Sequence, residues 1–182
     1  MSGWRCVSSG LFKLGLSLMV LMAADLRPSR AQPVLAEAAS VSGLPLPRFV
    51  SISANRANLR KGPGRQYPVA WILQRRNLPV EVIGEFEHWR KIREVSGEIG
   101  WVHKSRLSGR RMGMVVSAAR SEKLVSGYRD PRKETPVLMA EPGAIGEIRS
   151  CEGEWCVLRF EGKSAWMPRE SIWGVYPNEE ID

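Results

Sequence analysis

The sequence predicts an all-β protein in which an N-terminal signal peptide and a linker precede two small β domains in tandem. An uncharged apolar run, residues 14–24, lies near the N-terminus. From Phe49 onward, short β-favouring runs alternate with Gly, Pro and Asn, a pattern typical of small all-β domains. Pairs of tryptophans recur about 65 residues apart. These three observations divide the 182 residues into a leader and two similar halves.

The N-terminal segment has the charge and hydropathy pattern of a signal peptide. Arg5 and Lys13 lie before the apolar run, and no acidic residue accompanies them. The run is about half of the roughly 20 residues that a membrane-spanning helix needs, so we expect cleavage and no membrane span afterwards. Small residues predict cleavage after Ala31, with a second possible position at Ala24. The predicted signal peptide is residues 1–31.

The remaining chain divides by composition and by charge. Residues 32–47 are rich in Ala, Ser and Pro, with Glu37 as the one charge, and are predicted to be a flexible or extended linker. Domain 1 is predicted over 48–110, domain 2 over 111–176 and a tail over 177–182. Residues 48–111 hold 14 Lys and Arg against 5 Asp and Glu, a net charge of +9, whereas 112–182 have a net charge of −3.

The strands of the first domain are predicted from short apolar runs bounded by turn residues. They are Phe49–Ser53, Val69–Leu73, Pro79–Phe86, Trp89–Glu94 and Ile99–His103. Alternation predicts that Val80, Val82, Trp89 and Ile92 face the interior, and that Glu81, Arg90 and Arg93 face water. Glu87 and His88 are predicted to form the hairpin turn.

The second half repeats this layout. Trp89 and Trp101 lie twelve positions apart, and Trp155 and Trp166 lie eleven apart. Residues 85–89 correspond to 151–155, and Pro68-Val69 corresponds to Pro136-Val137. Domains of some 60 residues have difficulty in forming a sufficient core, so we expect the four tryptophans to fill the two interiors.

Cys151 and Cys156 are the cysteines that remain after removal of the leader, which contains Cys6. Their five-residue spacing places them on facing strands of a tight hairpin, so we predict a disulfide rather than two free thiols. The short loop suggests that the bridge fixes the hairpin more than it holds the fold. The spacing is wrong for a C-x-x-C redox motif, and further ligands are missing nearby, so neither a metal nor a cofactor is predicted.

Three segments of the first domain resemble the signature of bacterial SH3-like (SH3b) domains. They are 58–64 (NLRKGPG), 67–69 (YPV) and 100–102 (GWV). The second copy departs from the pattern at Tyr128 and Ala165, yet its cysteine pair and the segment 173–177 (WGVYP) resemble exported two-copy SH3-like proteins of Gram-negative bacteria. The resemblance implies a periplasmic protein with two small β-barrels, each of about five strands with a short 3₁₀ turn near its end, here at 105–108 and 170–172. Relatives of this family are often attached to wall-active enzymes or bind wall peptides, and many stand-alone members have no assigned role.

The residues do not supply a catalytic set, so we expect a non-enzymatic protein. His88 and His103 are interpreted as surface residues, and Glu85 with Glu87 as a hairpin edge rather than a paired-carboxylate site. The basic domain 1 favours a polyanionic partner, and export argues against nucleic acid. Aromatic faces beside cations suit extended peptides or anionic polymers. The residues predicted to bind a ligand are Arg60, Arg65, Tyr67, Trp71 and Trp89.

Two functions stay open at this point. The first is an envelope binding protein whose SH3-like domains recognise peptidoglycan peptides or a periplasmic protein. The second is a structural or assembly protein without a small ligand. A third hypothesis is a wall hydrolase or an accessory of one. The clusters Arg75-Arg76 and Arg106, Arg110, Arg111 are interpreted as solvated charges, or as cations that face the acidic second copy.

Overall fold

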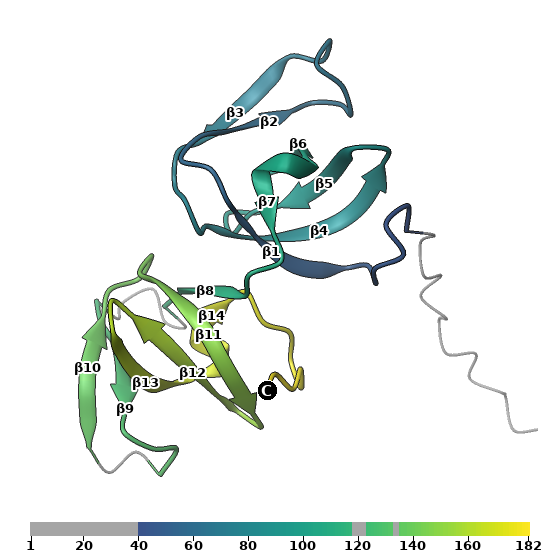
Figure 1. The fold of residues 1–182 in the computed structure, drawn as a ribbon. Coiled ribbons are helices and arrows are strands. Elements are labelled where there is room, and N and C mark those ends of the chain that lie inside the picture. The colour runs from purple at the N-terminus through teal and green to yellow at the C-terminus, as the bar shows by residue number, and fades with distance from the viewer. Residues whose placement is uncertain (1–39, 118–122, 133–134) are drawn as a thin grey trace, which may run out of the picture. The chain divides into compact units, whose positions relative to one another are not determined.

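A computed structural model describes residues 40–117, 123–132 and 135–182. The predicted signal peptide and residues 32–39 of the predicted linker lie outside these ranges. Two antiparallel sheets of seven strands each account for most of the described chain, and Figure 1 shows the strands of each sheet curling around their own interior. The prediction of an all-β fold with two small barrels is confirmed.

The first module contains one more substantial strand than the sequence predicted. Its strands are β1 (Arg48–Ile52), β2 (Ala57–Arg60), β3 (Val69–Leu73), β4 (Pro79–Phe86), β5 (Trp89–Arg93), β6 (Ile99–His103) and β7 (Leu107–Ser108). A 3₁₀ turn, η1 (Lys104–Arg106), precedes β7. The unpredicted strand β2 alternates buried and exposed residues, as a strand with one face toward a core does. The sheet order is β3-β2-β6-β5-β4-β1-β7.

The second module repeats this order strand for strand. Its elements are β8 (Met112–Val115), β9 (Val125–Tyr128), β10 (Pro136–Ala140), β11 (Ile145–Glu152), β12 (Trp155–Phe160), β13 (Lys163–Pro168), η2 (Arg169–Ser171) and β14 (Ile172–Trp173). The order β10-β9-β13-β12-β11-β8-β14 is that of the first sheet. The repeat therefore reflects two copies of one topology. The strand register makes Trp71 equivalent to Leu138, so the predicted correspondence of Pro68-Val69 with Pro136-Val137 is wrong by one residue.

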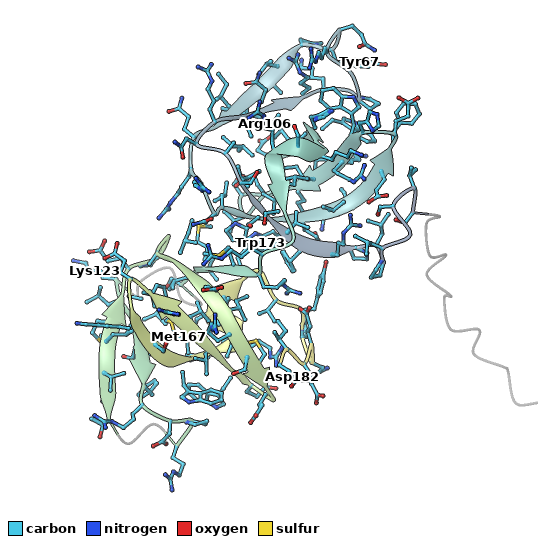
Figure 2. All side chains as sticks on the ribbon, viewed as in Figure 1. Tyr67, Arg106, Lys123, Met167, Trp173 and Asp182 are labelled. Carbon is cyan, nitrogen blue, oxygen red and sulfur yellow. A yellow bond between two sulfur atoms is a disulfide. The ribbon has the colours of Figure 1, made fainter. Side chains whose placement is uncertain are left out.

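Each module has its own hydrophobic core, and both cores are mainly aliphatic. The first core contains Val50, Ile52, Ala57, Leu59, Val80, Val82, Ile92 and Val102. The second contains Val115, Val125, Ala140, Ile148, Cys151, Cys156, Leu158, Met167, Ile172 and Val175. Met167, labelled in Figure 2, is fully buried there. The expectation that tryptophans fill the interiors is wrong, because all four lie partly exposed on the outer faces of their strands.

The alternation of β4 and β5 also differs from the prediction. Val80, Val82 and Ile92 are buried as expected, but Arg90 shares the inward face of β5 with Ile92, and Trp89 lies on the outer face. Arg90 and Glu81 are both only 7% exposed. Buried charges need partners. Glu85 provides one for Arg90 at 3.0 Å, and Arg93 provides one for Glu81 at 3.0 Å.

The predicted disulfide joins Cys151 of β11 to Cys156 of β12, which face each other across the hairpin with their Cα atoms 4.1 Å apart. Both cysteines are buried in the second core. Part of the predicted tail covers them, because Cys151 N–H donates to the Ile181 carbonyl at 2.8 Å. The bridge is thus a component of the core as well as of the hairpin.

Several contacts join residues of the first module to the C-terminal part of the chain. The Phe49 ring lies 5.2 Å from that of Trp173 and 4.7 Å from that of Tyr176. Trp173 Nε1 donates to the Pro79 carbonyl at 3.2 Å, and the Tyr176 hydroxyl donates to Glu81 at 3.0 Å.

The arginines that follow the first module also pair with acids of the second. Arg110 bonds Glu147 at 3.1 Å, and Arg111 bonds Glu179 at 2.6 Å. Of the two interpretations of these cations, as solvated charges or as partners of the acidic second copy, the ion pairs agree with the second, although the Arg110 side chain is also 53% exposed. Within the described ranges, no helix has the length and apolar character needed to cross a membrane.

Candidate functional site

A groove on the first module is the strongest candidate for a binding site. It lies on the outer face of β2, β5 and β6 and is closed at one side by η1, and its volume is about 390 Å³. Its lining residues are polar or aromatic, and they are Arg56, Asn58, Arg60, Arg65, Trp89, His103, Ser105 and Arg106. Of the residues predicted to bind a ligand, Arg60, Arg65 and Trp89 thus line one groove.

Strand alternation creates this surface. In β2, Ala57 and Leu59 are buried, so Asn58 and Arg60 project to the other side. Trp89 of β5 faces His103 of β6 across the sheet, and their rings meet edge to face with centroids 5.4 Å apart. The groove floor is therefore set by the same alternation that fills the core.

His103 also begins η1. Its Nδ1 accepts the Ser105 backbone N–H at 3.3 Å and lies 2.8 Å from the Ser105 hydroxyl. Burial, followed by the nearby charges of His88, Arg65, Lys104 and Arg106, lowers the pKa of His103 below its ordinary value. The lowered pKa favours the neutral imidazole, whose Nδ1 serves as the N-cap of the 3₁₀ turn.

Arg60 fixes one wall of the groove. Its Nη1 donates to the carbonyls of Arg65 at 3.2 Å and Tyr67 at 2.7 Å, and thereby holds the loop between β2 and β3. Close packing in this loop requires glycine at position 62. A Cβ there would lie 2.4 Å from Cδ1 of Tyr67, and the φ of this glycine is not positive. The glycine thus serves the close approach of the Tyr67 ring.

Tyr67 and Trp71 do not line the groove. Tyr67, labelled in Figure 2, packs against Gly62 and is 40% exposed. Trp71 lies on the edge strand β3, is 56% exposed, and donates its indole N–H to Glu98 at 3.1 Å. The side chains of Tyr67 and Trp71 therefore lie outside the groove that Arg60, Arg65 and Trp89 line, although the Tyr67 carbonyl accepts a hydrogen bond from Arg60.

Sequence reasoning missed five lining residues, namely Arg56, Asn58, His103, Ser105 and Arg106. Asn58 belongs to the signature segment, and its neighbour Leu59 is buried. The alternation of a strand over 57–60 was the signal that would have placed Asn58 and Arg60 together. Arg106 lies on η1, which brings it to the groove although it is more than 40 residues from Arg60 in sequence.

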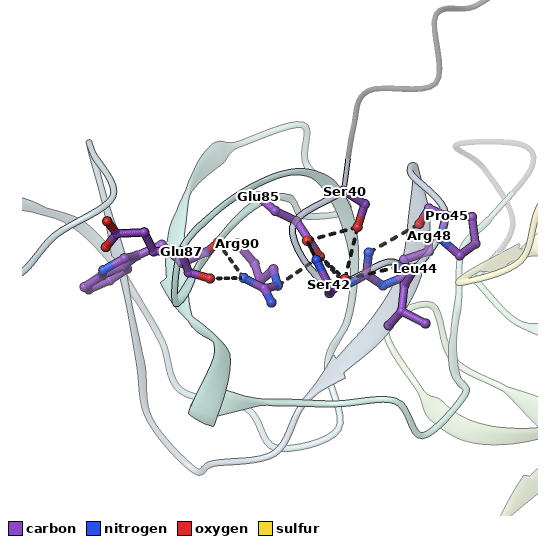
Figure 3. A network of polar contacts seen from close by, with 9 residues as sticks. Ser40, Ser42, Leu44, Pro45, Arg48, Glu85, Glu87 and Arg90 are labelled. Atoms are coloured by element: carbon purple, nitrogen blue, oxygen red, sulfur yellow. Dashed lines mark hydrogen bonds and ion pairs between the residues drawn. The ribbon is translucent and has the colours of Figure 1, made fainter.

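Glu85 lies in a different network that ties the segment before β1 to the first module (Figure 3). Arg48 donates to its carboxylate at 2.7 Å, Arg90 lies 3.0 Å away, and the Ser42 hydroxyl and Ser40 hydroxyl donate at 2.7 and 3.0 Å. Burial alone would raise the pKa of Glu85, but the bonds from Arg48, Ser42 and Ser40 lower it to about 2. A carboxylate so held cannot act as a general acid at neutral pH.

The equivalent surface of the second module has a different composition. Tyr128 takes the place of Arg60, and its ring packs edge to face on Trp155 at a centroid distance of 5.8 Å. Pro168 stands opposite Trp155, where His103 stands opposite Trp89. Arg60 and the capping histidine of the first groove are thus replaced. In the described part of the chain, no three His, Cys, Asp or Glu side chains cluster as metal ligands would.

Comparison with known proteins adds a family match. Residues 53–109 and 121–174 match the bacterial SH3 domain, and each match begins after the first strand of its module. No curated protein matches the chain.

Among solved structures, NlpC2 and NlpC1 from Trichomonas vaginalis are similar, at 14% and 15% identity and a TM-score of 0.32 each. The matches cover 70% and 80% of this chain, which spans about half the length of each of those proteins, 48% and 51%.

Proposed function

Since this chain belongs to the bacterial SH3 domain family, we propose that it is a non-enzymatic binding protein of the cell envelope, exported to the periplasm, whose first module recognises cell-wall peptides. The groove between β2, Trp89 and η1 carries the proposal. It offers an aromatic face, an amide side chain and several cations over a volume of about 390 Å³, which falls within the range of small-ligand sites. The leader pattern of residues 1–31 supports export.

The geometry of the acid–base candidates supports a binding role over catalysis. The carboxylate of Glu85 is inaccessible, with its side chain 0% exposed, and is held ionised by arginines. His103 uses Nδ1 to cap η1. We expect purified protein to leave the turbidity of wall suspensions unchanged, and clearing that is lost in the Glu85→Gln or His88→Ala variant would contradict the non-enzymatic assignment.

Retention on purified sacculi tests the binding role. We expect wild-type protein and the Trp155→Ala variant to be retained equally, and Trp89→Ala to be retained at least tenfold less, because Trp89 lines the groove and Trp155 belongs to the other module. Urea midpoints of both variants verify folding. Retention of the wild type no better than that of an unrelated basic protein would refute wall binding.

A second function, assembly with another periplasmic protein, is favoured by the contacts of Phe49 with Trp173 and Tyr176, which place aromatic rings of both modules together. In this alternative, the chain presents a surface made from both modules. Crosslinking in the native periplasm tests it. A wild-type chain that captures no specific protein, while it is retained on sacculi, would exclude this alternative in favour of the first.

A further inference from the structure

The cations of the groove lack carboxylate partners within the module. The first module has five glutamates, and four of them are engaged outside the groove. Glu81 pairs with Arg93, and Glu85 pairs with Arg48 and Arg90. Glu94 accepts a hydrogen bond from Ser96, and Glu98 accepts one from Trp71. Glu87 lies exposed in the hairpin turn after β4. Among the described residues, therefore, no acid forms an ion pair with any arginine of the groove.

Three of these arginines have their guanidinium groups entirely free for a ligand. Arg56, Arg65 and Arg106 are exposed and form no side-chain hydrogen bond or ion pair to any residue in the described ranges. Like charges gathered in a concave surface repel one another and attract anions from solution. The arrangement therefore favours a ligand that carries more than one negative group.

All four cations of the groove are arginines, although the module also contains lysines, Lys61, Lys91 and Lys104. A guanidinium forms paired hydrogen bonds with a carboxylate and stacks on aromatic rings, which an ammonium group does less well. The residue type therefore matches carboxylate recognition next to an indole.

The other lining residues favour a peptide over a bare phosphate. Trp89 offers an apolar face, and Asn58 offers both a donor and an acceptor suited to amide groups. A phosphate ion would use only the cations. A short peptide with several carboxylates would use the cations, the indole and the amide together.

We propose that the groove binds a wall stem peptide through its free carboxylates, with Arg65 and Arg106 as contacting cations and Trp89 against the apolar part of the peptide. This inference rests on the proposed function and adds the chemistry by which the ligand is recognised. Arg60 holds the loop wall in place and contributes its remaining N–H groups.

Titration calorimetry with the purified mature chain tests the proposal. The probe is a stem tripeptide of L-alanine, γ-linked D-glutamate and meso-diaminopimelate, used as the free acid and with its carboxylates converted to amides. We expect amidation to weaken binding at least tenfold. The Arg65→Ala, Arg106→Ala double variant should also lose at least tenfold, whereas the Arg75→Ala, Arg76→Ala double variant, with the same change in charge, should change less than twofold.

Each other result has a defined meaning. Equal affinity for the acid and the amide would overturn carboxylate recognition while leaving wall binding intact. Inorganic phosphate that displaces the tripeptide at equal concentration would overturn the choice of a peptide in favour of a simple anion site. Sacculus retention without tripeptide binding would overturn this inference alone, whereas loss of both would refute the proposed function itself. Because the two arginines are exposed and unbonded, their removal leaves folding unaffected.

Discussion

The β4–β5 hairpin of the first module and the β11–β12 hairpin of the second solve one structural problem in two ways. Glu85 faces Arg90 in the first, and Cys151 faces Cys156 at the equivalent register in the second. One pair is a buried ion pair and the other is a disulfide. The same cross-strand position thus has a strong link in both copies, ionic in the first and covalent in the second.

Each link is also covered by a segment from outside its hairpin. Ser40 and Ser42 bond Glu85, whereas Ile181 bonds the backbone of Cys151. The first cover comes from the chain before β1 and the second from the chain after β14. The comparison teaches that the first module depends on ionisation and the second on oxidation for the same connection.

The two cores also differ in which residue fills the interior at one equivalent position. In the first, Leu59 fills the interior and lies against Gly100, where a Cβ would come within 2.6 Å of Leu59 Cγ. In the second, Gly127 takes the place of Leu59, and Leu138 fills the space above it. Trp71 is equivalent to Leu138 but is 56% exposed, whereas its cross-strand partner Leu59 is fully buried.

The largest expected effect comes from truncating this core anchor. We expect Leu59→Ala to lower the free energy of unfolding of the first module by about 4 kcal/mol, because a fully buried leucine leaves a cavity. Leu138→Ala should cost less, since Leu138 is only partly buried. Urea unfolding followed by fluorescence measures both, and equal losses would contradict the assigned exchange of roles.

The next effect concerns ionisation. The pKa of Glu85 falls from 4.5 to about 2 in the folded protein, so its stabilisation is complete above pH 4.5 and is lost as pH falls toward 2. Glu85→Gln should cost about 3 kcal/mol at pH 7 and should remove this part of the pH dependence.

Urea unfolding between pH 7 and pH 3 measures the effect of Glu85→Gln. The control is Glu147→Gln, which removes two more exposed ion pairs, with Arg110 and Arg149, and should cost less than about 0.5 kcal/mol. A Glu85→Gln variant with the acid sensitivity of the wild type would show that Glu85 is not the group that titrates.

Reduction tests the second module in the same way. We expect dithiothreitol to lower the free energy of unfolding of that module by about 2 kcal/mol, since a short disulfide loop restricts the unfolded chain modestly. The Cys151→Ala, Cys156→Ala variant serves as the control and should not respond to the reductant. Loss of stability in the first module on reduction would contradict the inference that only the second module depends on a disulfide at this position.

The smallest effect is expected at Trp71. Trp71→Leu introduces the residue that the second module has at this position, and should change stability by less than about 0.5 kcal/mol because the indole is largely exposed. Sacculus retention should stay within twofold of wild type. A tenfold loss of retention would show that Trp71 contacts the ligand, as the sequence analysis predicted.

Strand positions, the repeat and the disulfide could be predicted because they depend on local patterns. The bounds Val69–Leu73, Pro79–Phe86 and Ile99–His103 agree with the observed strands. The direction of the faces was harder to predict, because the buried charge of Arg90 is paired with Glu85, which lies on another strand. An apolar-or-polar alternation rule has no means of representing such a pair.

The candidate site was predictable only in part, for a related reason. Arg60, Arg65 and Trp89 belong to segments whose signature or aromatic character was visible, and they line the same groove. Arg106 and Ser105 join them through η1, a short turn whose direction depends on the His103 cap. These side chains are distant in sequence and meet only when the barrel closes, so local sequence patterns do not predict their proximity.

The double hydrogen bond of Arg60 to the loop between β2 and β3 has a practical consequence. Any ligand that engages Arg60 competes with, or reinforces, its hold on the carbonyls of Arg65 and Tyr67. Deuterium uptake at the loop amides should therefore serve as a label-free gauge of occupancy, even for ligands that leave tryptophan emission unchanged.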